Sequence, residues 1–457
     1  MTTEPTAAAG GAEAVGTIGT VTVVRFRASE IAEAVDGVLH GDDTGVDGAS
    51  IDSRTLSPGQ LFVPVVGVRD GHDFLVSAVT AGAGAVLSAR GPVDGVATVV
   101  VDDAEAALVR LGHHARGRLP ERVVGITGSV GKTSTKDLCA VALATRFRVS
   151  ASQKSFNNEL GVPLTLTNAA DDTEVTVLEM GARGRGHIAA LCAVGRPTIA
   201  VVTAVELVHA ELMGDLDGIA LTKGELPESL PPDGVAVLNA AYERVAAMAA
   251  RTTARVVRYG TADSDVRATG VVVDDELRAR FRLETEWGAA DVRLGVRGAH
   301  QVDNALAAAA VALVCGVPVD DVAAGLAVGE LSPWRMDLGT ATSGARILND
   351  AYNASPASVA AALQSLVSLR VSRFHAVLGP MAELGDEGPA EHRRIAALAQ
   401  SLGVAVVAFR TDEYGLPPVA DVDEALAALG PLDRGDAVLV KGSRVAGLEL
   451  LAEVLLS

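Results

Sequence analysis

The sequence predicts an α/β protein of three domains: a small α/β domain, a central domain with a mainly parallel sheet, and a Rossmann-like, doubly wound C-terminal domain. Three observations support this fold class. The chain has 457 residues, about half of them apolar, which suits about three cores at a usual domain size of roughly 150 residues. Short β-rich runs alternate with apolar helical patterns along most of its length. A glycine-rich turn joins a strand to a helix near residue 128.

The N-terminal part is predicted to be a tail followed by a small domain. Residues 1–20 are rich in Ala, Gly, Thr and Glu without periodicity, so they cannot bury enough apolar surface to order themselves. Residues 21–119 contain the β-rich runs Leu61–Val66 and Ala97–Val101 and the helical stretch Phe74–Ala81. We expect these elements to form the first α/β domain.

A second block, residues 120–330, starts with the apolar strand Val123–Thr127 and continues through a glycine turn into the helical segment Thr133–Thr145. Further strands, Val175–Leu178 and Thr198–Thr203, are separated by helical patterns. Strands that alternate with helices favour a parallel sheet.

The third block, residues 331–457, follows the linker Leu331-Ser332-Pro333 and alternates regularly between strands and helices. The expected strands are Arg346–Asn349, His375–Leu378, Val404–Phe409 and Ala437–Val440. The expected helices are Ser358–Leu369, Glu391–Leu402, Val422–Leu429 and Leu448–Leu456. A doubly wound sheet is the simplest arrangement for them.

Composition excludes several classes of protein. A formal charge of -19 argues against non-specific binding to nucleic acid or to anionic membranes, since both need a broad basic surface. The longest apolar run, Ala305–Val317, is shorter than the roughly 18 residues of a membrane span, and no signal peptide opens the chain. The three cysteines lie singly in apolar stretches, as core residues do. We therefore expect a cytoplasmic protein without membrane insertion.

The segment Gly128-Ser129-Val130-Gly131-Lys132-Thr133 has the features of a phosphate-binding loop. Glycines let successive N–H groups point at phosphate oxygens, the helix N-terminus adds positive potential, Lys132 neutralises charge, and Thr133 offers a hydroxyl to magnesium. The strict motif has Gly where this chain has Ile126. A plain glycine turn is the alternative, but its place between strand and helix favours nucleotide binding.

Three more polar residues follow strands or lie on a helix in this block. Glu179 ends an apolar strand, where its carboxylate would be a magnesium ligand beside a triphosphate or else a solvated strand end. His209 follows the strand that ends at Thr203, and Lys223 lies on the helical stretch Asp217–Leu226, which Pro227 is expected to end. A lone His or Lys is usually structural or solvated, so neither residue alone indicates a function.

Several motifs occur together in an order that resembles the Mur ligase family, with its MurF branch as the best match. Besides the phosphate loop, they are Asp52-Ser53-Arg54, Asp70-Gly71-His72-Asp73, Ser155–Pro163, Glu179-Met180-Gly181, Gly298-Ala299-His300 with Asn304, Asp350-Ala351-Tyr352-Asn353, Met381–Gly385 and Lys441-Gly442-Ser443. The resemblance covers nearly everything after the tail.

The resemblance implies an ATP-dependent ligase of the cytoplasmic cell-wall pathway that works as a monomer on small molecules. ATP would phosphorylate the terminal carboxylate of a UDP-linked muramyl tripeptide, and the amine of D-alanyl-D-alanine would displace the phosphate. The first domain would hold the uridine nucleotide, the central P-loop domain would bind ATP, and the third would close over the site and help to bind the incoming amine. A carboxylate lacks a good leaving group, whereas an acyl phosphate has one.

The resemblance also implies roles for residues, assigned by their position in the motifs. ATP would contact Gly128, Ser129, Gly131, Lys132, Thr133, Ser134, Asn304, Arg335 and Asp350. Two Mg²⁺ ions would be held by Thr133, Glu179, His209 and a carbamylated Lys223, and Lys132, Glu179, His209 and Lys223 would be catalytic. Substrates would contact Ser53, Arg54, Asn157, Asn158, Tyr352 and Asn353. Taken alone, Arg335 would be interpreted as a residue that forms a salt bridge in the linker, and Asn304 as a helix cap or turn residue.

Carbamylation requires a neutral amine, so we expect burial to lower the pKa of Lys223.

The chain departs from the family pattern at several positions around this machinery. They are Ala204 and Glu206 before His209, Ala241-Tyr242, Trp334, Asn349, Ser355 and Pro380. Two alternatives therefore stay open: a paralogue that joins a different acid and amine in a specialised peptide pathway, and a non-catalytic nucleotide-binding subunit.

Overall fold

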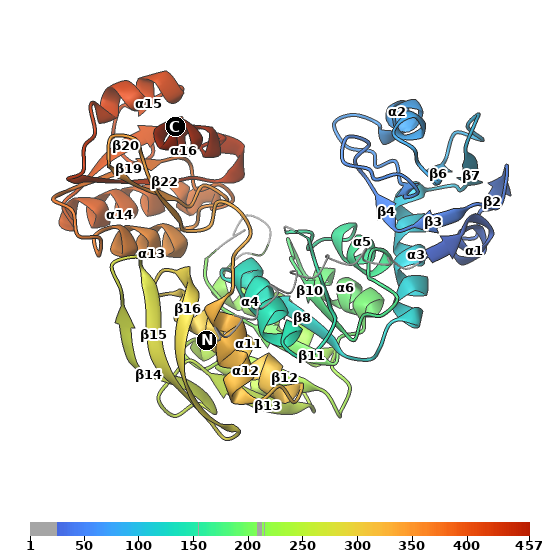
Figure 1. Ribbon diagram of the computed structural model, residues 1–457, viewed down its shortest axis with the longest axis horizontal. Coiled ribbons are helices and arrows are strands. Elements are labelled where there is room, and N and C mark those ends of the chain that lie inside the picture. Colours follow the sequence, from blue (N-terminus) through green and yellow to red (C-terminus); the bar gives the residue numbers. More distant parts are fainter. Residues whose placement is uncertain (1–24, 154, 208–212, 214) are drawn as a thin grey trace, which may run out of the picture.

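The computed structural model describes residues 25–153, 155–207, 213 and 215–457. Its sheets form three units along the chain, and the N-terminal and C-terminal units stand at opposite ends of the central one (Figure 1). Most strand pairs are parallel, and helices cover the sheets. The predicted α/β fold class is confirmed.

The N-terminal unit is built on a five-stranded sheet in the order β2-β7-β6-β5-β4, with β1 and β3 paired beside it. Its elements are β1 (Arg25–Arg27), α1 (Ala28–Ala34), β2 (Val38–His40), β3 (Gly45–Asp47), β4 (Ala49–Ser50), β5 (Leu61–Phe62), the 3₁₀ turn Gly71–Phe74, α2 (Leu75–Thr80), β6 (Ala85–Ser88), β7 (Ala97–Val100) and α3 (Ala104–Arg118). Both expected strands and the expected helix are present, although β5 is shorter than predicted.

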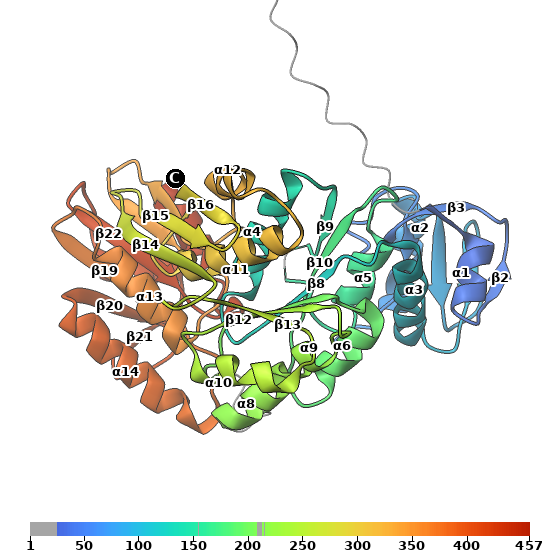
Figure 2. The same cartoon turned by 90° about the horizontal axis from the view of Figure 1, so that it is seen from below.

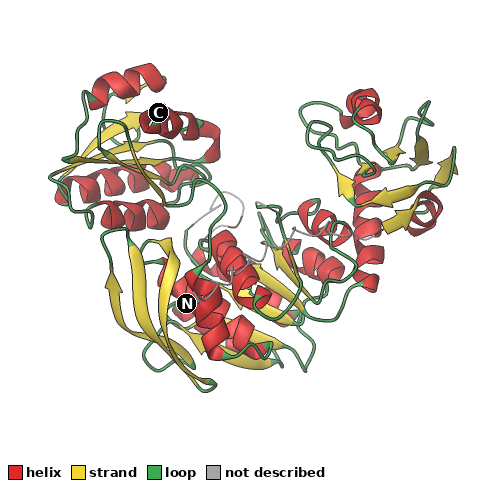
Figure 3. Cartoon of the chain, viewed as in Figure 1, coloured by secondary structure: helices red, strands yellow, loops and turns green. Residues whose placement is uncertain are grey.

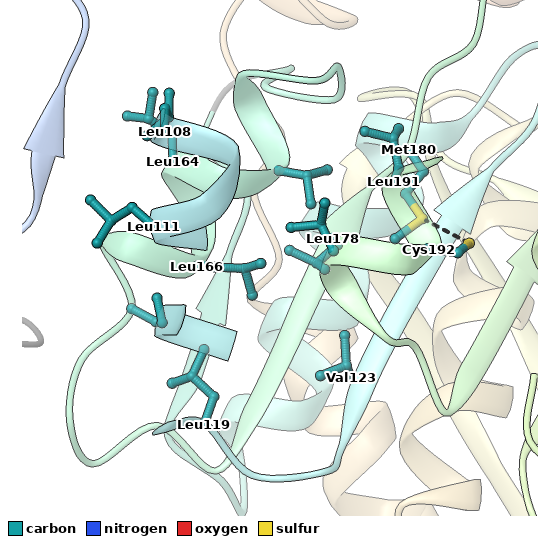
Figure 4. Close-up of a cluster of buried hydrophobic side chains, with 14 of the residues drawn as sticks. Leu108, Leu111, Leu119, Val123, Leu164, Leu166, Leu178, Met180, Leu191 and Cys192 are labelled. Carbon is teal, nitrogen blue, oxygen red and sulfur yellow. Dashed lines mark hydrogen bonds between the residues drawn. The ribbon is translucent and has the colours of Figure 1, made fainter. Parts of the chain in front are cut away.

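Helix α3 joins this unit to the central one. Gly112 of α3 approaches Pro163 so closely that an added Cβ would lie 2.6 Å from the proline Cβ. One buried cluster continues from the N-terminal sheet through Leu108 and Leu111 of α3 to Leu178 and Met180 (Figure 4). Because such cores are close-packed, α3 holds the two units together.

The central sheet has nine strands in the order β16-β15-β14-β13-β12-β11-β8-β10-β9. Its strands are β8 (Val123–Thr127), β9 (Val149–Ala151), β10 (Val175–Glu179), β11 (Ile199–Val202), β12 (Val235–Asn239), β13 (Arg255–Tyr259), β14 (Val266–Val273), β15 (Arg278–Thr285) and β16 (Gly288–Arg297). The pairs from β9 to β14 are parallel, which confirms the expected parallel sheet. The antiparallel arm β14–β16 was not predicted (Figure 3).

Helices cover both faces of this sheet. They are α4 (Lys132–Ala144), α5 (Gly161–Thr167), α6 (His187–Gly195), α8 (Leu216–Lys223), α9 (Glu225–Glu228), α10 (Glu243–Ala246) with the 3₁₀ turn Ala247–Arg251, α11 (Gln301–Val314) and α12 (Val319–Ala327). Figure 2 shows α4, α11 and α12 on one face and α6 and α9 on the other. Most of the longest apolar run of the sequence, Ala305–Val317, lies in α11, a helix buried in the core. Among the described residues, no helix has the length and apolarity that crossing a bilayer requires.

One expected helix boundary is wrong. Pro227 does not end the helix that carries Lys223; α8 ends at Lys223, and Pro227 lies inside the separate helix α9. Proline fits there because the first turn of a helix has N–H groups without intrahelical acceptors.

The C-terminal unit has a six-stranded sheet in the order β17-β18-β22-β19-β20-β21, parallel except for the pair β17–β18. Its elements are β17 (Asp337–Thr340), β18 (Arg346–Asn349), α13 (Pro356–Leu366), β19 (Arg373–Leu378), the 3₁₀ turn Gly385–Glu387, α14 (Gly388–Ser401), β20 (Val404–Phe409), β21 (Pro418–Val419), α15 (Val422–Leu429), β22 (Asp436–Lys441), the 3₁₀ turn Arg444–Ala446 and α16 (Glu449–Leu456). Helices α13 and α14 pack on one face and α15 and α16 on the other, which confirms the doubly wound arrangement.

The antiparallel arm positions the C-terminal unit. Leu277, in the turn between β14 and β15, is fully buried in the cluster formed by α13, α14 and their sheet. Two ion pairs flank it, Glu276 with Arg346 at 2.8 Å and Asp275 with Arg370 at 2.8 Å. The arm therefore brings the C-terminal unit against the central unit, where their facing surfaces enclose a cavity.

Candidate active site

A cavity of about 720 Å³ lies where the central and C-terminal units face each other. Its central wall includes the phosphate loop, the loop after β9, Glu179 and Lys223. Its opposite wall includes residues around the start of α13, the loop after β19 and the end of β22, namely Asn353, Ala354, Ser355, Ala357, Ser358, Ala361, Ala382, Glu383, Leu384, Lys441, Ser443, Arg444 and Val445. The carboxyl ends of the parallel strands thus open into one pocket, which is where α/β sheets bind ligands.

The phosphate loop connects β8 to α4 as the sequence predicts. Gly128 and Gly131 have positive φ angles of 150° and 82°, which a residue with a side chain rarely adopts. The Lys132 ammonium donates to the carbonyl oxygen of Gly128 at 2.7 Å, and burial lowers its pKa. Thr133 and Ser134 are buried in the first turn of α4. Lys132 is thereby held over the loop, ready to meet phosphate oxygens.

Glu179 lies at the end of β10, beside the loop, and is almost fully buried. Its Oε1 accepts a hydrogen bond from the side-chain amide of Asn157 at 2.8 Å. Its Oε2 is buried without a hydrogen-bond partner. A buried carboxylate oxygen without a partner is costly unless a cation meets it, so a divalent cation fits this position.

Lys223 ends α8 with its side chain 1% exposed. Burial, reinforced by the nearby positive charge of Lys132, lowers its pKa to about 7. The expected depression of the pKa of Lys223 is therefore confirmed, and much of this amine is neutral near pH 7. A neutral amine can react with carbon dioxide.

The fourth predicted metal ligand, His209, lies outside the described residues. In the part of the chain that the structure describes, no three His, Cys, Asp or Glu side chains cluster as a metal site. Thr133, Glu179 and Lys223 nevertheless line the same cavity.

Asn304 and the start of α11 close one side of the phosphate loop. The Asn304 Oδ1 accepts from the Thr135 hydroxyl at 3.1 Å, and its amide donates to Gln301 at 2.8 Å. An added Cβ on Gly131 would lie 2.5 Å from this oxygen, so glycine is required there. These contacts place Asn304 against the phosphate loop, while the cap position of α11 is taken by His300.

Arg335 enters the cavity from the linker between the units. Its guanidinium lies 4.2 Å from the ring centroid of Tyr352, and its Nε is buried without a partner. Trp334 and Met336 on either side have positive φ angles of 62° and 56°. Such backbone is strained and persists only where surrounding structure imposes it. The linker conformation therefore aims Arg335 toward the phosphate loop, rather than into the surface salt bridge that a linker arginine usually forms.

Asp350 follows β18 and is fixed by Lys441. The Lys441 ammonium lies 2.5 Å from the Asp350 carboxylate and also donates to the carbonyl oxygen of Asn353 at 2.9 Å. Tyr352 contacts the hydroxyl of Ser155 across the cavity. This last contact links the loop after β9 in the central unit to the C-terminal unit.

The predicted substrate residues divide into two groups. Asn157, Asn158, Tyr352 and Asn353 line the cavity together with all of the predicted nucleotide residues except Gly128. Ser53 and Arg54 do not; they lie in the separate N-terminal unit, where Arg54 is paired with Asp52 at 2.7 Å. The first group therefore lies in the cavity between the central and C-terminal units, and the second group lies on the N-terminal unit, outside that cavity.

Two departures from the family pattern contact each other. The Tyr242 hydroxyl donates to the Glu206 carboxylate at 2.8 Å, and burial raises the pKa of Glu206. The backbone N–H and carbonyl of Glu206 both bond to the Ser129 hydroxyl at 2.9 Å. Glu206 therefore braces the phosphate loop from the β11 side, away from Glu179.

Other departures have structural roles. Asn349 accepts from the Ala351 N–H at 3.2 Å, and Ser355 caps α13 through the N–H of Ser358. The Pro380 carbonyl accepts from the N–H of Ser443 at 2.9 Å. The Trp334 ring lies under Arg444, 4.4 Å from its guanidinium carbon.

Some lining residues were not predicted as site residues. Lys441 and Glu383 belong to motifs that the sequence displays, but nothing in those motifs indicates that they line the same cavity as the phosphate loop. His300 is the N-cap residue of α11, and Asp303 lies in the first turn of that helix, next to Asn304. Only the packing of the two units brings them together.

Comparison with known proteins agrees with this geometry. Models of the Mur ligase middle domain and of the Mur ligase, glutamate ligase domain match residues 126–312 and 334–444. The UDP-N-acetylmuramoyl-tripeptide--D-alanyl-D-alanine ligase of Mycobacterium tuberculosis is 41% identical over 95% of this chain and 98% of its own length. That of Escherichia coli is 34% identical over 93% of this chain and 97% of its own.

Solved structures of MurF proteins are also similar to this chain. MurF from Acinetobacter baumannii superposes with a TM-score of 0.84 at 28% identity, covering 95% of this chain and all of that one. MurF from Thermotoga maritima in complex with ADP superposes with a TM-score of 0.76 at 27% identity, covering 89% of this chain and 96% of that one. The chain belongs to the Mur ligase family, within its MurF branch.

Proposed function

We propose that this ATP-dependent peptide ligase adds D-alanyl-D-alanine to a UDP-N-acetylmuramoyl tripeptide in peptidoglycan synthesis. The relatives that match nearly its whole length carry out this reaction by name. The observation that carries the proposal is the single cavity into which the phosphate loop, Glu179, Lys223 and Arg335 open together. That cavity suits a reaction in which a triphosphate, a carboxylate and an amine must meet.

The mechanism follows from the charges in the cavity. The phosphate loop and Lys132 hold the ATP phosphates, and a carboxylate oxygen of the tripeptide attacks the γ-phosphorus in line with the departing ADP. The amine then attacks the carbonyl carbon of the acyl phosphate, a C–N bond forms, and the C–O bond to phosphate breaks. Lys132 and Arg335 offset the negative charge that builds up in both steps.

Magnesium fits the side chains on the Glu179 side of the loop. The unpartnered Oε2 of Glu179, the Thr133 hydroxyl and a carbamylated Lys223 are oxygen donors of the kind that Mg²⁺ prefers. Bound there, the ion would neutralise phosphate charge. His209 stays a predicted ligand.

The other assignments complete the proposal. Residues 21–119 form the unit that binds the uridine diphosphate, through Ser53 and Arg54; residues 120–330 bind ATP; and residues 331–457 close over the site. We place the enzyme in the cytoplasm, since ATP and a nucleotide-linked sugar peptide are cytoplasmic metabolites. We expect it to act as a monomer.

A screen of phosphate release tests the substrates. The enzyme is offered UDP-muramyl tripeptides that differ in their third residue, each with D-alanyl-D-alanine, L-alanyl-L-alanine or single amino acids. We expect release only with ATP, a tripeptide substrate and D-alanyl-D-alanine together. Rapid turnover with another acid and amine, and none with this pair, would indicate a paralogue instead. ATP binding without release in any combination would indicate a non-catalytic subunit.

A further inference from the structure

Arg335 reaches the cavity from a short linker, so its guanidinium has a fixed position relative to the phosphate loop when the central unit holds that linker. The contact that holds it comes from Asp137 on α4. The N–H and the hydroxyl of Ser332 both donate to one oxygen of the Asp137 carboxylate, at 2.8 and 2.9 Å. We propose that Asp137 is a positioning residue of the reaction, which fixes the linker and thereby sets where Arg335 meets the ATP phosphates; the proposal rests on the function proposed above.

Asp137 belongs to the helix that starts at the phosphate loop. It follows Lys132 on α4 by about 7.5 Å along the helix axis, at the usual rise per residue. The inner face of α4, which includes Leu138 and Leu143, is fully buried in the central core. Because such a core is close-packed, the helix is held as one rigid element. The linker is therefore fixed to the same element that carries the Lys132 ammonium.

A buried lysine holds the Asp137 side chain in place. The Lys136 ammonium lies 2.7 Å from the second oxygen of this carboxylate, and it also donates to the carbonyl oxygen of Ser152 at 2.7 Å. Lys136 is 3% exposed, and the Asp137 side chain is 14% exposed. Breaking a buried ion pair is costly because it leaves a charge without its partner. One carboxylate oxygen therefore stays with Lys136, and the other is directed at Ser332.

The same network continues to Glu179 at the end of β10. The hydroxyl of the buried Ser152 accepts the backbone N–H of Glu179 at 3.1 Å. Consecutive contacts thus connect the start of the linker to Glu179, and both Glu179 and Arg335 line the cavity. The ion pair on α4 therefore ties the carboxylate that suits a cation to the segment that carries Arg335.

The linker has little freedom between its fixed start and Arg335. Trp334 and Met336, on either side of Arg335, have φ angles of 62° and 56°. The C-terminal unit holds the segment from its other end, since Asp337 at the start of β17 accepts the N–H of Trp334 at 2.7 Å. Strained backbone persists only while the surrounding structure imposes it. Releasing the end that Asp137 holds should therefore let the segment relax and move Arg335.

A purely structural role is the competing explanation, because a buried ion pair also affects folding. The two roles differ in whether the effect depends on Arg335. A positioning residue acts through that guanidinium, so its loss should matter only while the guanidinium is present. A residue that only stabilises the fold would change kcat by the same factor in either background.

The test is a double-mutant cycle between Asp137→Asn and Arg335→Ala in the full-length enzyme. An amide has the shape of a carboxylate, but one of its two ends is a donor, so it cannot accept from both Lys136 and Ser332. For Asp137→Asn alone we expect kcat to fall by about tenfold to a hundredfold, the scale of a misplacement by about 1 Å. In the Arg335→Ala background the same change should alter kcat by less than about twofold.

Two further variants accompany the cycle. Ser332→Ala keeps the backbone bond to Asp137 and loses the hydroxyl bond, so it should lower kcat by about threefold, again only while Arg335 is present. It serves if Asp137→Asn folds poorly. Asp321→Asn is the matched control, because Asp321 pairs with Arg146 on the surface beside the other end of α4. This control should behave as wild type.

A second readout follows the linker itself and needs no turnover. The chain has two tryptophans, Trp287 and Trp334, so in a Trp287→Phe background the fluorescence reports on the residue next to Arg335. A segment that opens locally exposes its side chains, and Asp137→Asn should therefore raise the acrylamide quenching of Trp334 about twofold. Asp321→Asn should leave the quenching unchanged.

The proposal is overturned if Asp137→Asn lowers kcat by the same factor with and without Arg335, or if the quenching of Trp334 does not change. A shift in the Mg²⁺ dependence would also overturn it, since the effect would then act through Glu179. If the wild-type enzyme releases no phosphate with any acid and amine while the quenching responds as expected, it is the proposed function that fails, and Asp137 still fixes the linker.

Discussion

Replacing Lys132 by alanine should abolish turnover, with kcat lower by roughly a thousand-fold or more, the scale of losing a positive group that stabilises phosphoryl transfer. Lys132 is a cation held over the phosphate loop, 2.7 Å from the carbonyl of Gly128. Without it, the loop loses its own cation, and the charge of the transferred γ-phosphoryl group is offset less completely. The measurement is phosphate release with ATP, a tripeptide substrate and D-alanyl-D-alanine at saturation.

The matched control is Arg146→Ala, which removes a cation just beyond the other end of α4. Arg146 pairs with Asp321 on the surface and does not line the cavity. This control should keep wild-type kcat, because Arg146 lies outside the cavity. It should also keep wild-type stability, because exposed ion pairs contribute little to the free energy of unfolding. Both variants should show wild-type thermal unfolding. If Lys132→Ala kept more than a tenth of the wild-type kcat, the phosphate loop would not be the site of phosphoryl transfer.

Replacing Lys223 by alanine should lower kcat by about a hundred-fold or more, because an anionic metal ligand of the carbamylated enzyme would be lost. Alanine leaves space where the buried side chain was, so added formate or acetate should restore part of the activity. Lys223→Met is the matched control, since it fills that space with an apolar chain of similar length. It should be inactive and should not respond to either anion.

The wild-type pH profile gives a related expectation. Burial lowers the pKa of Lys223 to about 7, so below that pH the amine is protonated and cannot carry a carbamate. Activity should therefore fall as the pH falls through about 7, and added bicarbonate should oppose the loss. Lys223→Ala rescued by acetate should lack this decline. Full activity of Lys223→Ala without any added anion would show that the lysine is no part of the metal site.

The fold was predictable where local patterns decide the structure. β18, β20 and α15 have the expected bounds, because strand and helix periodicities are clear and turn residues separate them. The antiparallel arm was missed although β15 alternates buried and exposed residues. Its role depends on Leu277 reaching the core of another unit, and no local pattern specifies such a distant contact.

The residues of the site could be predicted where a sequence motif alone indicates their chemistry. The phosphate loop could be derived from chemistry, since glycines, a lysine and a helix start are all visible in the sequence. Glu179 and Lys223 are different: one ends an ordinary strand and the other lies on an ordinary helix. Burial and the shared cavity make them distinctive, and burial is a property of the packed chain. The contact between Glu206 and Tyr242 likewise joins residues that are far apart in sequence.

The central claim is that ATP phosphorylates the terminal carboxylate of the acid substrate in this cavity. It can be tested by labelling both oxygens of that carboxylate with ¹⁸O and analysing the phosphate released after D-alanyl-D-alanine addition. An acyl phosphate transfers one carboxylate oxygen to phosphorus, so each released phosphate should contain one ¹⁸O atom and the new amide should retain the other. Phosphate free of ¹⁸O, together with normal product formation, would contradict the claim.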